Sequence, residues 1–104
     1  MNIVMEFRKG ILFVRLSGLF NDNNIKEFDT NVKEVIIEGG IKYVVLNISE
    51  LKEISKNAIK EIKRLRKMII KTKGKFYLFG GDIRELRRLV HLENELNVFE
   101  KVVI

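Results

Sequence analysis

Residues 42–48, Lys-Tyr-Val-Val-Leu-Asn-Ile, form an apolar run that is rich in β-branched side chains and lacks a clean alternation with polar ones. A strand of this composition is typically covered on both faces, as the strands of parallel sheets are. The run lies between two segments of helical period, residues 24–38 and 57–72. The pattern over residues 24–72 therefore predicts a helix, a buried strand and a second helix in succession.

Further strands are expected on both sides of this centre. Residues 3–8 and 11–16 flank the dipeptide Lys9-Gly10, and two strands joined by a two-residue turn that ends in Gly are typical of a hairpin. Residues 76–79, Phe-Tyr-Leu-Phe, form a short apolar run after the second helix. The sequence therefore predicts an antiparallel pair before the first helix and another strand after the second.

The last quarter of the chain adds one helix and one strand. Asp82 has Glu85 three residues later, which is the spacing of a capping box at a helix start, and residues 98–104 predict a final strand. The order is then β-β-α-β-α-β-α-β, which implies parallel strands with helices packed on the sheet. No linker or repeat interrupts residues 1–104, so we expect a single α/β domain with a mixed sheet.

Signals at the two central helices define their ends and their buried faces. Asn24 and Glu27 have capping-box spacing, and Gly39 and Gly40 supply the residues that end many helices. The second helix carries an apolar stripe at a spacing of three or four residues. The stripe consists of Ala58, Ile62, Leu65 and Ile69. Between residue 48 and this helix, the sequence predicts a loop over residues 49–56.

Composition excludes several classes of function. The chain has no Cys, which excludes disulfides and thiolate metal sites, and its single His91 leaves no His-rich site. No apolar stretch approaches the roughly 20 residues of a membrane-spanning helix, and no secretory leader is recognisable, so we expect a cytoplasmic protein. Four carboxylates are scattered over a predicted solvent face: Asp22, Asp29, Glu34 and Glu38. Without a catalytic pairing among them, we expect no enzyme, no cofactor and no metal.

Positive charge is concentrated in the second half of the chain. The formal net charge is +6, and residues 52–75 alone carry ten basic and two acidic side chains. Five lysines form one stripe along the second predicted helix: Lys56, Lys60, Lys63, Lys67 and Lys71. The stripe is open to three interpretations, namely a solvated face, a surface for an acidic protein, or a surface for nucleic acid or another polyanion. Nucleic acid is the weaker binding interpretation, because the stripe contains no aromatic residue.

The motifs that punctuate the chain resemble the STAS domain family from end to end. Residues 14–20, Val-Arg-Leu-Ser-Gly-Leu-Phe, are similar to the family's strand and Leu-x-Gly turn, and residues 43–49 resemble its strand that ends in Asp-Leu-Ser. The glycines at 39–40, 74 and 80–81 fit the family's pattern as well. The resemblance implies the STAS fold and a non-catalytic interaction module. The best-known members are anti-sigma-factor antagonists, which regulate transcription by binding an anti-sigma factor, often a serine-protein-kinase-like ATPase.

The chain departs from the family at the motif that is phosphorylated in regulated members. The family's Asp-Ser-Ser-Gly falls on Ser55-Lys56-Asn57-Ala58, so the phosphate-accepting position is Asn57, and the family's strand-end Asp is Asn47. Asn57 has no hydroxyl, so we expect no phosphorylation switch there and a domain fixed in an unmodified-like state. Ser55 is left with two roles, as the N-cap of the second helix or as a displaced phospho-acceptor.

The resemblance places the partner-binding surface at the start of the second helix and the turn beside it. A helix N-terminus presents unpaired backbone N–H groups and a partial positive charge, which suits a regulated docking surface. The residues expected there are Asn21, Asp22, Ser49, Ser55, Lys56, Asn57 and Lys60. We expect an anti-sigma factor as the partner, and a chain that is a monomer or a weak dimer.

Overall fold

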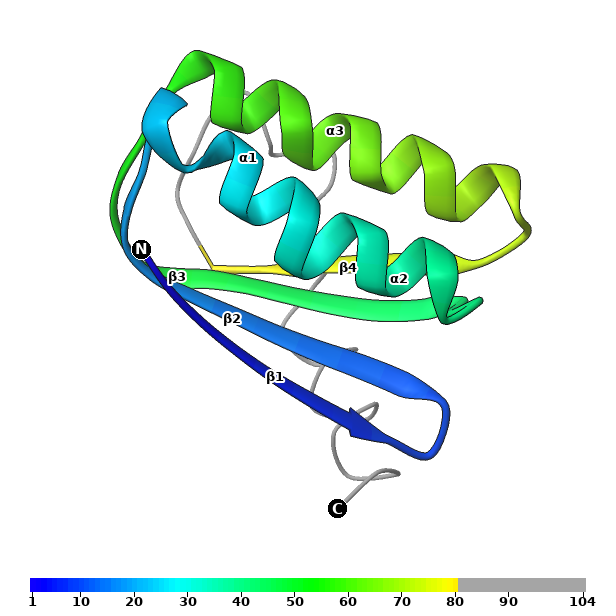
Figure 1. Ribbon diagram of the computed structural model, residues 1–104. Helices are drawn as coiled ribbons and strands as arrows, with labels where there is room; N and C mark the ends of the chain where they lie inside the picture. Colours follow the sequence, from blue (N-terminus) through cyan, green and yellow to red (C-terminus); the bar gives the residue numbers. More distant parts are fainter. Residues whose placement is uncertain (81–104) are drawn as a thin grey trace.

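The computed structural model describes residues 1–80, which form a four-stranded sheet with a layer of helices over one face (Figure 1). The strands lie side by side in chain order: β1 (Asn2–Arg8), β2 (Ile11–Phe20), β3 (Tyr43–Ile54) and β4 (Lys75–Phe79). β1 pairs antiparallel with β2, whereas β2 with β3 and β3 with β4 pair in parallel. The mixed sheet expected from the sequence is confirmed.

The helical layer contains two helical stretches that run next to each other above the sheet (Figure 1). The first comprises η1 (Asp22–Asn24), α1 (Ile25–Phe28), η2 (Asp29–Lys33) and α2 (Glu34–Glu38). Here η1 is a 3-10 turn and η2 is a π-helical turn, so the stretch is not the single regular helix that its period predicts. The second stretch is α3 (Lys56–Lys71), which follows β3 almost directly.

The connections between the elements follow the expected order. Lys9 and Gly10 both have positive φ, 49° and 84°, as the two central residues of a type I′ hairpin turn do. The order β-β-α-β-α-β is therefore confirmed over residues 1–80. The helix expected from Asp82 and the strand expected at 98–104 lie outside the described residues. Within residues 1–80, no helix combines the length and the apolar character needed to cross a bilayer.

The main core fills the space between the sheet and the helices. The rings of Phe20, at the end of β2, and Phe28, at the end of α1, lie with their centroids 5.0 Å apart and join the two layers. The strands contribute the buried side chains of Leu12, Val14, Leu16, Val44, Leu46, Ile48, Phe76 and Leu78. The predicted apolar stripe of α3 (Ala58, Ile62, Leu65 and Ile69) is buried against them, as expected.

The first half of β3 has buried side chains on both faces of the sheet. Val44 and Leu46 belong to the main core, and neither exposes measurable surface. Val45 points to the other face, where it is 3% exposed and forms a second cluster with Ile11. The partly buried rings of Phe13, Tyr77 and Phe79 pack against this cluster. The predicted coverage of both faces is therefore confirmed for residues 44–46, whereas Tyr43 is exposed and Asn47 is only partly buried.

Both central strands are longer than the sequence predicts. β2 continues to Phe20, and β3 continues to Ile54 through most of the expected loop at residues 49–56. The two extensions pair with each other in parallel, with register shifts on either side of Gly18. Leu51 and Ile54 pack against the core from this part of β3. The loop prediction was wrong because most residues of the extension are polar and face solvent. Only Leu51 and Ile54 contact the core, and two apolar residues are too few to form a recognisable strand pattern.

The N-cap of the first helical stretch is Asn21, three residues before the expected Asn24. The side chain of Asn21 accepts a hydrogen bond from the backbone N of Asn23 at 2.9 Å, and the backbone N of Asn21 donates to Asn24 Oδ1 at 3.1 Å. These two bonds form a capping box. The expected box from Asn24 to Glu27 was wrong, because Asn24 serves as the second partner of Asn21 instead.

Candidate partner-docking site

Ser55 caps the N-terminus of α3. Its backbone is extended, with φ −80° and ψ 163°, and its Oγ accepts a hydrogen bond from the backbone N of Ala58 at 3.1 Å. The backbone N of Ser55 donates to the carbonyl O of Phe20 at 2.9 Å, which ties the cap to the end of β2. The N-cap role of Ser55 is therefore confirmed, whereas its phosphorylation stays a prediction.

Asp22 lies against this cap from a distant part of the chain. Its Oδ1 accepts a hydrogen bond from Ser55 Oγ at 2.8 Å, and its Oδ2 accepts one from Asn57 Nδ2 at 3.0 Å. The first turn of α3 contains no acidic residue of its own. Because the N-terminus of a helix carries a partial positive charge, the Asp22 carboxylate is favoured at this position. A side chain of the protein thus supplies the anion that a helix N-terminus attracts.

The turn that carries Asp22 is anchored on both sides by hydrogen bonds and by a buried ring. The capping box of Asn21 fixes the backbone immediately before and after it. The side chain of Phe20 is fully buried and packs on Phe28, so the chain enters the turn from an anchored position. The position of the Asp22 carboxylate is therefore determined by the core as well as by its own hydrogen bonds.

Six of the seven expected binding residues come together at this end of the molecule. We name as the docking patch Asn21, Asp22, Ser55, Lys56, Asn57 and Lys60. The side chains of Asp22, Lys56, Asn57 and Lys60 are exposed, and the half-buried Asn21 and Ser55 support them from below. The two lysines stand one helical turn apart on α3, so they lie on the same side of the helix.

Ser49 does not share these contacts. It lies within β3, six positions before Ser55 along a nearly continuous strand, which is up to about 20 Å at the rise of a strand. Its backbone N and its Oγ both donate to Asn47 Oδ1, at 2.9 Å and 2.6 Å. A Cβ added to Gly80 would lie 2.4 Å from Ser49 Cβ, so the end of β4 approaches Ser49 closely. A partner that contacts Ser49 must reach along β3, away from the docking patch.

The lysine stripe of α3 is exposed along its whole length. All five residues, Lys56, Lys60, Lys63, Lys67 and Lys71, are exposed, while the opposite side of the helix is buried in the core. The stripe starts inside the docking patch and continues to the last turn of α3. Exposure of the stripe is thus confirmed, and the nature of its partner stays a prediction.

A buried carboxyl pair was missed from the sequence. Glu61 is only 4% exposed and forms an ion pair with Arg64, and one of its oxygens, Oε2, is buried without a hydrogen-bond partner. Asp29 from η2 faces it with a buried Oδ1. Burial, and then the Glu61 carboxyl, raise the pKa of Asp29 above its ordinary value, and the charges of Lys33 and Arg64 oppose the shift only in part.

The expectation that Asp29 lies on the solvent face was therefore wrong, whereas Asp22, Glu34 and Glu38 are exposed as expected. The sequence held a signal for the partner carboxylate, because Glu61 falls at the helical spacing of the buried stripe, three residues after Ala58 and four before Leu65. Among residues 1–80, no three His, Cys, Asp or Glu side chains gather in a way that could hold a metal ion.

Comparison with known proteins agrees with this architecture. The sequence profile of the STAS domain matches residues 2–103, nearly the whole chain. Comparison with curated proteins finds no significant match. Similar solved structures include the anti-sigma factor antagonist SpoIIAA in its unphosphorylated form, with a TM-score of 0.78, 12% sequence identity and coverage of 97% of either chain.

Two further structures share the fold. One is the Bacillus cell-fate determinant SpoIIAA in its phosphorylated form, with a TM-score of 0.77 and 12% identity, covering 97% of this chain and 99% of the other. The other is a candidate anti-sigma factor antagonist of Thermotoga maritima, with a TM-score of 0.71 and 17% identity, covering 97% of this chain and 82% of the other. At these identities the likeness concerns the fold, and the family is established by the sequence match. The chain belongs to the STAS domain family.

Proposed function

We propose that this chain is a non-catalytic, cytoplasmic interaction module that acts as an anti-sigma-factor antagonist. In this role it binds an anti-sigma factor through the docking patch, so that the anti-sigma factor releases its sigma factor. The observation that carries the proposal is the Asp22 carboxylate held between Ser55 and Asn57 at the N-terminus of α3. Membership of the STAS family and the fold shared with SpoIIAA support the same role.

The proposed antagonist works without phosphorylation at Asn57. An amide side chain cannot accept a phosphoryl group, and here it is already bonded to Asp22. A phosphate at this position would add about two negative charges beside that carboxylate, which the existing arrangement avoids. We therefore propose that the docking patch is permanently in the unmodified, binding-competent state.

The charge of the docking patch suggests an acidic contact surface on the partner. Lys56 and Lys60 are exposed at the patch, and the rest of the lysine stripe extends the positive field along α3. Complementary charge speeds association and selects partners more than it raises affinity. An anti-sigma factor with an acidic docking face would therefore be captured quickly, and more slowly as the salt concentration rises.

The test uses the purified full chain and the complex of an anti-sigma factor with its sigma factor from the same organism. We expect the wild-type chain to release the sigma factor without any phosphatase treatment. Lys60→Glu, inside the patch, should weaken binding at least tenfold, whereas Lys67→Glu, on the same stripe about 10 Å further along α3, should have little effect. Failure of the wild-type chain to bind any anti-sigma factor of the organism would refute the proposal.

The exposure of the whole lysine stripe favours one alternative, a protein that binds nucleic acid or another anionic surface. Five lysines in contact with phosphates would bind without sequence preference and with a steep dependence on salt. In that case Lys60→Glu and Lys67→Glu should weaken binding equally, because each removes one phosphate contact. The same pair of variants therefore distinguishes the two functions.

A further inference from the structure

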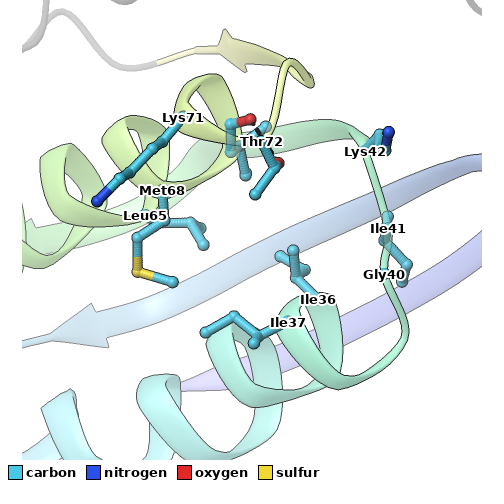
Figure 2. Close-up of a pocket in the computed structure, with 10 residues that line it drawn as sticks. Ile36, Ile37, Gly40, Ile41, Lys42, Leu65, Met68, Lys71 and Thr72 are labelled. Carbon is cyan, nitrogen blue, oxygen red and sulfur yellow. Dashed lines mark hydrogen bonds between the residues drawn. The ribbon is translucent and has the colours of Figure 1, made fainter.

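A second feature of the fold lies away from the docking patch, between α2 and the C-terminal half of α3. A cavity of about 390 Å³ opens there, within the size range of small-molecule sites (Figure 2). Leu65 and Met68 of α3 face Ile36 and Ile37 of α2 across it (Figure 2). The remaining lining residues are Gly40, Ile41, Lys42, Ile69, Lys71 and Thr72.

The walls of this cavity are almost entirely apolar. Most of the surface comes from isoleucine, leucine and methionine side chains, and methionine adapts readily to the shape of a ligand. Of the lining residues that the structure describes, Thr72 alone has an uncharged polar side chain, and its Oγ1 already donates to the carbonyl O of Ile69 at 2.8 Å. A polar ligand body would lose its bonds to water here without replacement. The body of a ligand that fits must therefore be apolar.

The rim of the cavity carries positive charge. Lys71 comes from the last turn of α3 and Lys42 from the segment before β3, and both are exposed. Lysine stems cover apolar surface while the ammonium group stays in water. Among the lining residues within 1–80, none has an acidic side chain. The charged end of a ligand that complements this rim is an anion.

We propose that the cavity binds a medium-chain fatty acid, with the alkyl chain between α2 and α3 and the carboxylate at Lys71 on the rim. The lining runs from Leu65 to Thr72, which is about 10 Å along α3 and suits a chain of medium length. None of the lining residues belongs to the docking patch, and Lys60 is about 12 Å from Met68 along the helix axis. The site is therefore separate from the proposed antagonist surface and can be tested without it.

Decanoate, decanol and decyltrimethylammonium, each added below its micelle concentration to the isotope-labelled full chain, test the proposal by NMR. We expect decanoate to shift the signals of Ile37, Ile41 and Met68, decanol to bind more weakly, and the cationic probe to bind least. Lys71→Gln should weaken decanoate binding about two- to fivefold, as removal of an exposed ion pair does. Lys67→Gln, one turn earlier on the exposed stripe, is the matched control and should leave it unchanged.

Ile37→Glu provides a second variant that should fold normally, because this side chain is 52% exposed. It places a carboxylate at the mouth of the cavity and should abolish decanoate binding while the backbone spectrum elsewhere is retained. Absence of decanoate shifts in the wild-type chain would overturn the proposal, as would equal binding of all three probes. The proposal would also be overturned if the wild-type protein formed a dimer that buried this cavity and excluded decanoate.

Discussion

The side-chain amide of Asn57 donates a hydrogen bond to the carboxylate of Asp22 across 35 residues of sequence, with 3.0 Å between Nδ2 and Oδ2. Asp22 thereby joins the turn after β2 to the start of α3 and satisfies the electrostatic preference of a helix N-terminus. This hydrogen bond between Asn57 and Asp22 does not require a hydroxyl group at position 57. The start of α3 is therefore closed by side chains of the chain itself, with Asn at the position where the proposed function needs no phosphate.

Replacing Asp22 should destabilise the domain measurably. Asp22→Ala removes two hydrogen bonds and the negative charge at the α3 N-terminus, and we expect the free energy of unfolding to fall by about 1–2 kcal/mol. Urea denaturation followed by circular dichroism measures this change. Glu38→Ala, which removes an exposed carboxylate at the end of α2, is the control and should cost nothing. Equal stability of the Asp22→Ala and Glu38→Ala variants would show that the Asp22 contacts contribute nothing.

Asn57→Ser should restore a phosphorylation site that the wild-type chain lacks. Incubated with ATP and a kinase-type anti-sigma factor of the organism, the variant should gain the mass of a phosphoryl group on residue 57, and the wild-type chain should gain none. The phosphorylated variant should also bind its partner more weakly, because two negative charges appear beside Asp22. A phosphoryl group found on Ser55 of the wild-type chain would contradict the account of a permanently unmodified patch.

The Asp29–Glu61 pair should make stability depend on pH. The pKa of Asp29 is raised by burial and then by Glu61, so the folded state binds this proton more tightly than the unfolded state does. The contribution of Asp29 to stability is therefore favourable at low pH, is lost as the pH rises from the ordinary aspartate value of 3.8 through the raised pKa, and is unfavourable above it.

Asp29→Asn should remove this pH dependence. At neutral pH the amide can donate to the unpartnered Glu61 Oε2, and we expect the variant to be more stable than wild type by about 0.5–1.5 kcal/mol. Denaturation curves at pH 4 to 8 test this, with Glu34→Gln as the exposed control. If Asp29→Asn is less stable than wild type at neutral pH, the two carboxyl groups do not oppose each other in the folded state.

Gly74→Ala should disturb the connection between α3 and β4. An added Cβ would lie 2.3 Å from the carbonyl O of Lys42, which accepts the backbone hydrogen bond of Lys75 at 2.7 Å. We expect a loss of about 1–3 kcal/mol, as for other overpacked sites, read from thermal unfolding. Gly10→Asn is the control, because nothing lies within 4 Å of its added Cβ and Asn tolerates positive φ. A similar small effect for both variants would show that the backbone near Gly74 yields easily.

The sheet and its helices could be predicted because local patterns determine them. The run at residues 42–48, the Lys9-Gly10 turn and the buried stripe of α3 each reflect periodicity or turn chemistry within a few residues. The extension of β3 past residue 48 could not be predicted in this way, since it depends on parallel pairing with the end of β2, which is distant in sequence.

The sequence predicted which residues belong to the candidate site but not the contacts between them. The residues of the docking patch were identified through the family resemblance, but the bonds from Ser55 and Asn57 to Asp22 span more than 30 residues and no local pattern encodes them. The buried position of Glu61 did leave a local signal in the helical spacing. A charged residue on an apolar stripe calls for a search of its surroundings, which here contain its ion-pair partner Arg64 and the second carboxyl group, Asp29.

The most direct test of the account is to map the surface that the anti-sigma factor covers. Titration of the unlabelled anti-sigma factor into the isotope-labelled full chain, followed by NMR, reports which backbone signals shift or broaden. We expect the effects to be confined to the docking patch, at Asp22, Lys56, Asn57 and Lys60, without prior phosphatase treatment. Effects centred on Phe13 and Tyr77, on the opposite face of the sheet, would contradict the claim that the start of α3 is the docking surface.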